Sequence, residues 1–104
     1  MLPAPEVQEA LGVYLELLTR WNKKINLTSL PLEPLTEAAI DRLLVEPLIA
    51  GREVLPTDRT LVDLGSGGGS PGIPLKLVSS SLSVKLVEVK VRKCAFLREV
   101  AREL

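Results

Sequence analysis

The stretch LVDLGSGGGSPGIPLKLV, residues 61–78, constrains the fold of this chain more than any other. A short apolar run, expected to be a strand over 61–64, carries Asp63 and leads into a glycine-rich turn over 65–69. Ser70 is suited to cap a following helix whose first position is Pro71 and which extends to about Val78. A strand, a glycine turn and a helix in this order are typical of the opening of a parallel α/β sheet.

A second strand and a second helix follow. VKLVEV, residues 84–89, is typical of a strand, and residues 91–104 have helical spacing with Cys94, Leu97, Ala101 and Leu104 on one face. The pattern predicts two parallel strands joined by a right-handed crossover, the first half (β-α-β-α) of a doubly wound, Rossmann-like α/β sheet. Because two strands rarely bury both faces of a parallel sheet, we expect the chain to be a fragment of a larger domain.

The part of the chain before the first strand is predicted to be helical. An amphipathic helix is expected over 6–25, and a second from Thr36 to Glu46, where Pro47 disturbs it and Gly51 can end it. Residues 52–60 have the composition of a polar connector. We therefore expect a helical N-terminal lead over 1–59 and the first half of an α/β domain over 60–104.

The amino-acid composition limits the catalytic groups and metal ligands that the chain can provide. The 104 residues include no histidine, which removes the usual general base and the commonest metal ligand, so no metal site is expected. Cys94 is the single cysteine, cannot form an internal disulfide, and favours a reducing, cytoplasmic compartment. Neither a signal peptide nor an apolar run of membrane-spanning length is recognisable. The formal net charge is zero, so contact with a nucleic acid would require a local basic patch.

The glycine turn is compatible with several ligands. A phosphate-binding loop of the nucleotide triphosphatases is excluded, because Gly72 is not followed by a lysine and a serine or threonine. The dinucleotide pattern G-x-G-x-x-G is matched formally by Gly67, Gly69 and Gly72, with Glu88 at the spacing of a ribose-binding acid. A tight structural turn beside an ordinary buried acid is a third interpretation.

Two features argue against a dinucleotide. Counted from Gly65, the first glycine after the strand, the third glycine of the pattern is replaced by Ser70. Asp63 would also repel a pyrophosphate bound at the start of the helix. S-adenosylmethionine carries an ammonium and a sulfonium group, which a carboxylate attracts, and Glu88 could bind its ribose hydroxyls. The loop therefore favours S-adenosylmethionine.

Three stretches together resemble one known family. They are WNKKINLTS over 21–29, DLGSGGGSPGIPLKLV over 63–78 and LVEVKVRKCAFLREV over 86–100. In this order and spacing they are similar to the glucose-inhibited division protein B family, the ribosomal RNA small-subunit methyltransferase G proteins. The resemblance implies a class I methyltransferase that transfers a methyl group from S-adenosylmethionine to the seven-position nitrogen of a guanine in 16S ribosomal RNA, free or in the small ribosomal subunit. That nitrogen already has a free lone pair and needs no general base, which fits a chain without histidine.

Carried over to this sequence, the resemblance assigns cofactor binding to the glycine loop and to the acids on either side of it. The residues are Asp63, Gly65, Gly67, Gly69, Ser70, Glu88, Val89 and Lys90. Asp63 would act on the ammonium side and Glu88 on the ribose. Three positions depart from the family pattern: Ser70 replaces a bulky apolar residue, Leu43 a histidine and Pro47 a serine. No catalytic residue is assigned, and the resemblance implies that this N-terminal half alone binds the cofactor weakly at best and is inactive.

Basic residues near two helix ends are the candidates for RNA contact. They are Arg20, Lys23, Lys24, Arg92 and Lys93, with Trp21 beside the first of them as a base-stacking candidate. Solvated helix ends and a core tryptophan would explain the same residues. Two other functions stay open: a non-catalytic truncated module that binds RNA or a partner, and a fragment of a dinucleotide-binding oxidoreductase.

Overall fold

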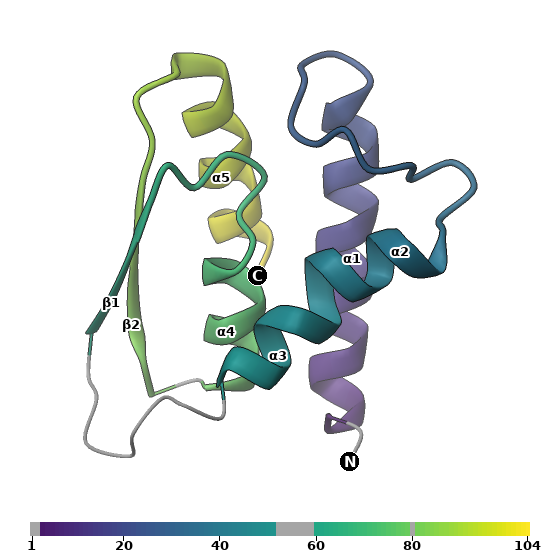
Figure 1. Ribbon diagram of the computed structural model, residues 1–104. Helices are drawn as coiled ribbons and strands as arrows, with labels where there is room; N and C mark the ends of the chain where they lie inside the picture. Colours follow the sequence, from purple (N-terminus) through teal and green to yellow (C-terminus); the bar gives the residue numbers. More distant parts are fainter. Residues whose placement is uncertain (1–2, 52–59, 80) are drawn as a thin grey trace.

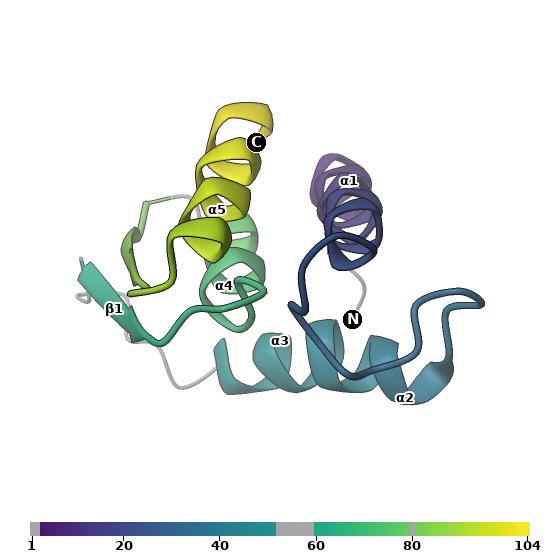
Figure 2. The same ribbon diagram turned by 90° about the horizontal axis from the view of Figure 1, so that it is seen from above.

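The computed structural model describes residues 3–51, 60–79 and 81–104 (Figure 1). A two-stranded sheet lies at one side, two helices pack on it, and the long first helix stands beyond them; Figure 2 shows the same order from above. The predicted connector over 52–60 lies outside the described residues except for Thr60. Within the described residues, no helix is both long and apolar enough to cross a membrane.

The sheet has the predicted parallel topology. β1 (Thr60–Leu64) and β2 (Ser83–Val87) pair in register with Asp63 opposite Leu86, and α4 (Gly72–Val78) connects them. β2 ends two residues earlier than predicted, so that Glu88 lies just past its end. α5 (Val91–Glu103) completes the β-α-β-α order, and the α/β class is confirmed.

The two faces of the sheet differ because side chains alternate along each strand. Asp63, Leu86 and their same-face neighbours are half-buried on the side that carries α4 and α5. On the other side, Val62, Leu64 and Val87 are 51%, 76% and 43% exposed. This second face also carries Thr60, Ser83 and Lys85, and no described helix or strand covers it.

The core lies where α1 (Pro5–Asn22) meets α4 and α5. The predicted end of this helix at residue 25 is wrong: α1 ends at Asn22, whose side-chain Oδ1 accepts hydrogen bonds from the Leu27 and Thr28 amides and so supports a turn. Its fully buried large side chains include Tyr14 and Leu18 of α1 and Phe96 of α5, and the Phe96 ring meets Trp21 edge-on with 5.9 Å between ring centroids. The buried residues of the cluster are Tyr14, Leu17, Leu18, Leu32, Ala39, Leu43, Ile73, Phe96, Leu97 and Val100. These contacts make α1 part of the same core as the β-α-β-α unit.

The predicted buried face of α5 is wrong in part. Leu97 is buried as expected, but Ala101 and Leu104 are exposed and Cys94 is only half-buried. Phe96, Leu97 and Val100 form the buried face instead. Apolar residues occur around most of this helix, so spacing alone left its orientation open, and packing against Trp21 of α1 decides it.

The second helical segment begins as predicted and continues further. Thr36 caps it by accepting a hydrogen bond from the Ala39 amide at 3.2 Å. It then continues through α2 (Glu37–Ile40), a wide π turn, η1 (Asp41–Val45), and α3 (Glu46–Ala50), with Gly51 after its last residue. The predicted end at Glu46 is therefore wrong. Pro47 is accommodated because the wider turn gives its ring room against the preceding turn.

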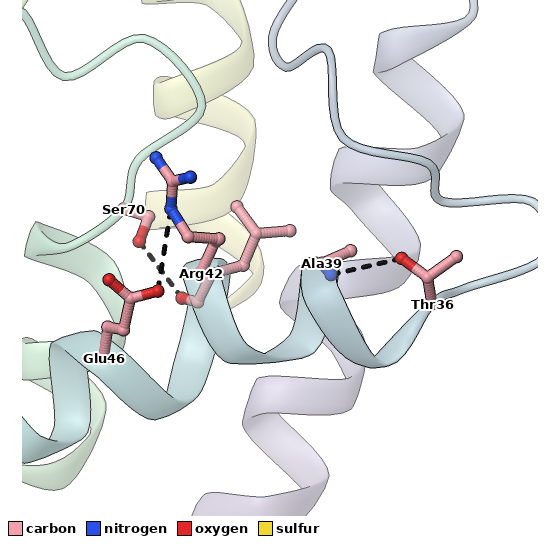
Figure 3. Close-up of polar contacts among 6 residues, drawn as sticks. Thr36, Ala39, Arg42, Glu46 and Ser70 are labelled. Carbon is pink, nitrogen blue, oxygen red and sulfur yellow. Dashed lines mark hydrogen bonds and ion pairs between the residues drawn. The ribbon is translucent and has the colours of Figure 1, made fainter.

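Ser70 has a different role from the predicted one. α4 begins at Gly72, and the Ser70 hydroxyl donates to the Leu43 carbonyl at 3.1 Å instead of capping the helix (Figure 3). Pro47 has no N–H, so Leu43 cannot receive the α-helical hydrogen bond from four residues ahead. Ser70 supplies a donor to that carbonyl, and this contact joins the exit of the glycine loop to the helical lead.

Alanine substitutions of Ser70 and Pro47, singly and together, test this hydrogen bond. Ser70→Ala should lower the free energy of unfolding by about 1–2 kcal/mol, because a part-buried carbonyl loses its donor. In a Pro47→Ala background, Ser70→Ala should lower the free energy of unfolding by less, since the new N–H of the alanine at position 47 can reach the Leu43 carbonyl. Urea unfolding of the four proteins measures the coupling; equal costs in both backgrounds would contradict it.

Candidate functional site

The glycine loop begins where β1 ends. Gly65 directly follows β1, as the count from Gly65 assumed, and its amide donates to the Val87 carbonyl at 2.8 Å. The amide of Ser66 donates to the same carbonyl at 3.0 Å. Gly67 and Gly69 have φ of +50° and +89°, a region in which any residue with a side chain is strained. The loop is therefore attached to the end of β2 and needs glycines to keep its course.

Glu88 binds the loop directly. Its Oε1 accepts a hydrogen bond from the Gly67 amide and its Oε2 one from the Lys90 amide, each at 2.9 Å. The Lys90 and Gly67 N–H groups, with a smaller effect of the Lys93 charge, lower the pKa of Glu88. The group is therefore ionised at neutral pH. Each carboxylate oxygen still has a free lone pair that can accept a hydroxyl from a ligand.

Asp63 binds the other end of the loop. Its Oδ2 accepts a hydrogen bond from the Gly72 amide, the first residue of α4, at 3.2 Å. Burial raises the pKa of Asp63, and the Gly72 N–H partly offsets this. Gly72 is needed here, because a Cβ would lie 2.6 Å from Leu86 Cδ2 and 2.8 Å from Asp63 Oδ2. Two carboxylates thus hold one loop, at its middle and at its exit.

Sequence reasoning missed three contacts that shape this loop. Ser66 is buried, and its hydroxyl donates to the Asp63 carbonyl at 2.9 Å. The Cys94 thiol donates to the Glu88 carbonyl at 3.0 Å and so has a polar contact beyond packing. The Tyr14 hydroxyl donates to the Gly68 carbonyl at 2.6 Å. A hydroxyl residue in the glycine turn, two residues after the strand, was a usable signal for Ser66, whereas the partner of Tyr14 lies 54 residues away.

Two basic segments meet at a hollow beside Glu88. The end of α1 with the residues after it, 22–26, and the start of α5 with the residue before it, 90–93, line a cavity of about 520 Å³, called here the basic hollow. In the described part of the chain, every charged residue that lines it is a cation: Lys23, Lys24, Lys90, Arg92 and Lys93. Lys23 pairs with Glu33 at 3.0 Å, so the excess of positive charge comes from the other four cations. Tertiary structure therefore concentrates positive charge that is balanced over the whole chain.

The other predicted residues lie as follows. Arg20 does not line the hollow and pairs with Glu16 at 4.0 Å one turn back on α1. Trp21 packs against Phe96, so its ring is part of the core. Val89 lies between Glu88 and Lys90 and is 89% exposed. The structure thus groups four of the five predicted basic residues with Lys90 and leaves Arg20 apart.

Comparisons with known proteins agree with one another. A family model described as rRNA small subunit methyltransferase G matches residues 7–104. A ribosomal RNA small subunit methyltransferase G of Xanthomonas euvesicatoria is 45% identical over 93 residues, which cover 88% of this chain and 41% of that protein. Proteins of the same name from Stenotrophomonas maltophilia and Gluconobacter oxydans are 43% and 42% identical, the latter over 93% of this chain and 48% of its own length. The chain therefore spans less than half the length of these relatives, and it belongs to the rRNA small subunit methyltransferase G (GidB) family.

Proposed function

We propose that this chain is the N-terminal part of an enzyme that methylates the seven-position nitrogen of a guanine in 16S ribosomal RNA with S-adenosylmethionine. The observation that carries the proposal is the glycine loop of this family member, held by Glu88 at Gly67 and by Asp63 at Gly72. Small-subunit RNA as the substrate would make the enzyme cytoplasmic.

The residues around the loop suit the cofactor chemically. Gly65, Gly67 and Gly69 leave the backbone bare for close approach, and the ionised Glu88 offers free lone pairs to ribose hydroxyls. Val89 and Lys90 lie next along the chain, where the exposed Val89 side chain could contact the adenine and the Lys90 backbone its edge. Asp63 would favour the ammonium end from below the loop, and Ser70 would contribute its backbone, since its hydroxyl proton is donated to Leu43. Bound S-adenosylmethionine would supply an electrophilic methyl group.

The amide contacts disfavour a dinucleotide. A pyrophosphate in this type of fold binds the loop amides and those of the first helical turn. Here Glu88 takes the Gly67 amide and Asp63 takes the Gly72 amide. A pyrophosphate would have to displace two carboxylates and then lie beside them, at a Coulombic cost. A cationic nucleoside avoids both penalties.

We further propose that β1 and β2 open a Rossmann-like sheet. The parallel pairing, the crossover by α4 and the position of the loop at the carboxyl end of β1 are those of such a sheet. The exposed face that carries Val62, Leu64 and Val87 is apolar enough to be covered by further elements of a complete domain. On this proposal, residues 60–104 form the first half of the cofactor-binding domain.

The basic hollow is the proposed RNA contact. Lys24, two residues past the end of α1, and Arg92, in the first turn of α5, both line it, and the start of α5 adds its helix dipole to the same positive potential. Cations at the start of a helix are unfavourable on their own, and a bound phosphate would offset that cost. The hollow includes Lys90, two residues from Glu88, so RNA bound there would lie close to the cofactor.

Methyl transfer can be tested with a chimera of this chain and the remaining C-terminal part of the Xanthomonas relative. It should transfer labelled methyl groups to 16S ribosomal RNA at a guanine that becomes cleavable by borohydride and aniline. Glu88→Gln should lower the transfer at least about tenfold, because a charged acceptor for ribose is lost. Glu103→Gln, at the far end of α5, is the matched control.

Binding by the same chimera separates the two cofactor classes. Titration with S-adenosylhomocysteine should shift the amide resonances of Gly65, Gly67, Gly69 and Lys90, and NADH should leave them unchanged. The reverse result would favour the oxidoreductase alternative. An inactive chimera beside an active intact relative would contradict the methyltransferase proposal.

Asp63→Asn should separate stability from binding. Since burial raises the pKa of Asp63, its ionised form destabilises the fold, and the chain loses stability as the pH rises through that raised pKa. The asparagine oxygen still accepts the Gly72 N–H without a charge, so the thermal midpoint at pH 7 should be equal or a few degrees higher. The difference should shrink as the pH falls through the raised pKa and Asp63 becomes protonated.

The affinity of Asp63→Asn for S-adenosylhomocysteine should fall about tenfold. Calorimetry across pH and an NMR titration measure both, and an unchanged affinity would remove Asp63 from the site.

Lys24→Ala and Arg92→Ala should each weaken binding to a 16S ribosomal RNA fragment. If each cation contacts one phosphate, the slope of log K against log salt should fall by about 0.7–0.9 per variant. Fluorescence anisotropy at several salt concentrations measures it. Arg98→Ala, an exposed position on α5 outside the hollow, should leave the slope unchanged. Equal slopes in all the proteins would show that RNA does not use the hollow.

A further inference from the structure

One peptide group of the glycine loop is held at both of its polar atoms. The carbonyl oxygen of Gly68 and the amide nitrogen of Gly69 belong to the same planar peptide. The Tyr14 hydroxyl donates to that carbonyl at 2.6 Å, and that amide donates to the Ser66 carbonyl at 2.6 Å. Rotation of this peptide would break both hydrogen bonds.

The orientation of this peptide controls the course of the loop. Gly69 has φ of +89°, and glycine pays little to leave such a conformation for another. A segment with adjacent glycines at 67–69 would therefore sample several peptide orientations if nothing held it. The two hydrogen bonds select one of them.

The helical lead also supports the loop through packing. A Cβ on Gly68 would lie 3.3 Å from Leu18 Cδ1 and 3.4 Å from the Leu27 carbonyl, so the backbone of Gly68 rests on α1 and on the segment after it. Tyr14 and Leu18 lie one turn apart on α1 and are both fully buried. The loop is thus seated on α1 by a hydrogen bond and by a close apolar contact.

The hydroxyl of Tyr14 has a task that the ring alone cannot perform. Phenylalanine would fill nearly the same volume in the core, yet it could not donate to Gly68. Burial, with a smaller effect of the Asp63 charge, raises the pKa of Tyr14. The hydroxyl therefore stays protonated, and remains a donor, at neutral pH.

We propose that Tyr14 is a positioning residue whose hydroxyl holds the Gly68–Gly69 peptide in the orientation that binds the cofactor. The inference rests on the proposed function, because it takes the glycine loop to be the cofactor loop. It gives α1 a role in cofactor binding: the helical lead preorganises the loop, so that binding does not have to order it.

Tyr14→Phe is the test, with Thr19→Val as the matched control. The Thr19 hydroxyl also donates to a backbone carbonyl, that of Leu15 at 2.8 Å, but within α1 and away from the loop. Both variants lose one hydroxyl from the same helix. Tyr14→Phe should raise the dissociation constant for S-adenosylhomocysteine about five- to tenfold and speed hydrogen exchange of the Gly69 amide. Thr19→Val should leave both unchanged, even where the two variants lose similar thermal stability.

The outcomes are distinct. Affinities are measured in the chimera, which restores the rest of the proposed cofactor-binding domain. Equal affinities in the two variants and the unaltered chimera, or equal Gly69 exchange rates, would overturn the role of Tyr14. Failure of the unaltered chimera to bind S-adenosylhomocysteine would count against the proposed function, while Gly69 exchange would still report on the hydroxyl. Should Tyr14→Phe not fold, the unaltered chain decides: its Gly69 amide should exchange at least about 100-fold more slowly than in an unstructured peptide, and a free-peptide rate would overturn the proposal.

Discussion

The hydrogen bond from the Gly67 amide to Glu88 is the contact on which the site depends. It joins the loop that follows β1 to the residue that follows β2, at the edge where both parallel strands end. Asp63 makes the corresponding contact with the first amide of α4. Each carboxylate satisfies an amide that would otherwise lack a partner, and so the loop can bend sharply between two strands and a helix.

The helical lead and the α/β unit are connected through this loop. Tyr14 of α1 binds the Gly68 carbonyl, and Ser70 at the loop exit binds the Leu43 carbonyl in η1. Ser70, Leu43 and Pro47 are the three positions that depart from the pattern of the resembling family. In the structure they form one arrangement: Pro47 lacks the N–H that would reach Leu43, and Ser70 provides a donor to the same carbonyl. The departures at Ser70 and Pro47 are therefore linked by one contact, whereas this contact does not explain the leucine at position 43, because it uses only the backbone carbonyl there.

The net charge of the chain does not show how unevenly its charges are distributed. The chain is neutral overall, yet the cations at the end of α1 and at the start of α5 line one hollow. Glu88, two residues before Lys90, is kept ionised by backbone N–H groups and by Lys93. The carboxylate proposed to bind the cofactor and the cations proposed to contact RNA can thus lie side by side, since local amides stabilise the carboxylate.

Local sequence was sufficient for the order of the elements and for the glycine turn. Alternating and helical spacing predicted β1, β2, α1 and α5, and the glycines at 65, 67 and 69 predicted a turn that only glycine tolerates comfortably, as their positive φ confirms. These features depend on neighbours within a few residues, which a sequence displays directly. The family, too, could be recognised from three short motifs, and the comparisons confirm it.

What only tertiary structure decided were the contacts between distant parts of the chain. Ser70 was expected to cap α4 but binds Leu43, and α5 buries Phe96 and Val100 where Ala101 and Leu104 were expected. Tyr14 was assigned to an apolar face without its partner Gly68, 54 residues away. Hydrogen-bond partners and buried faces of this kind are set by which helix packs beside which loop. Residue spacing limits which face of a helix can be buried, and packing against all of its neighbours determines which face is buried.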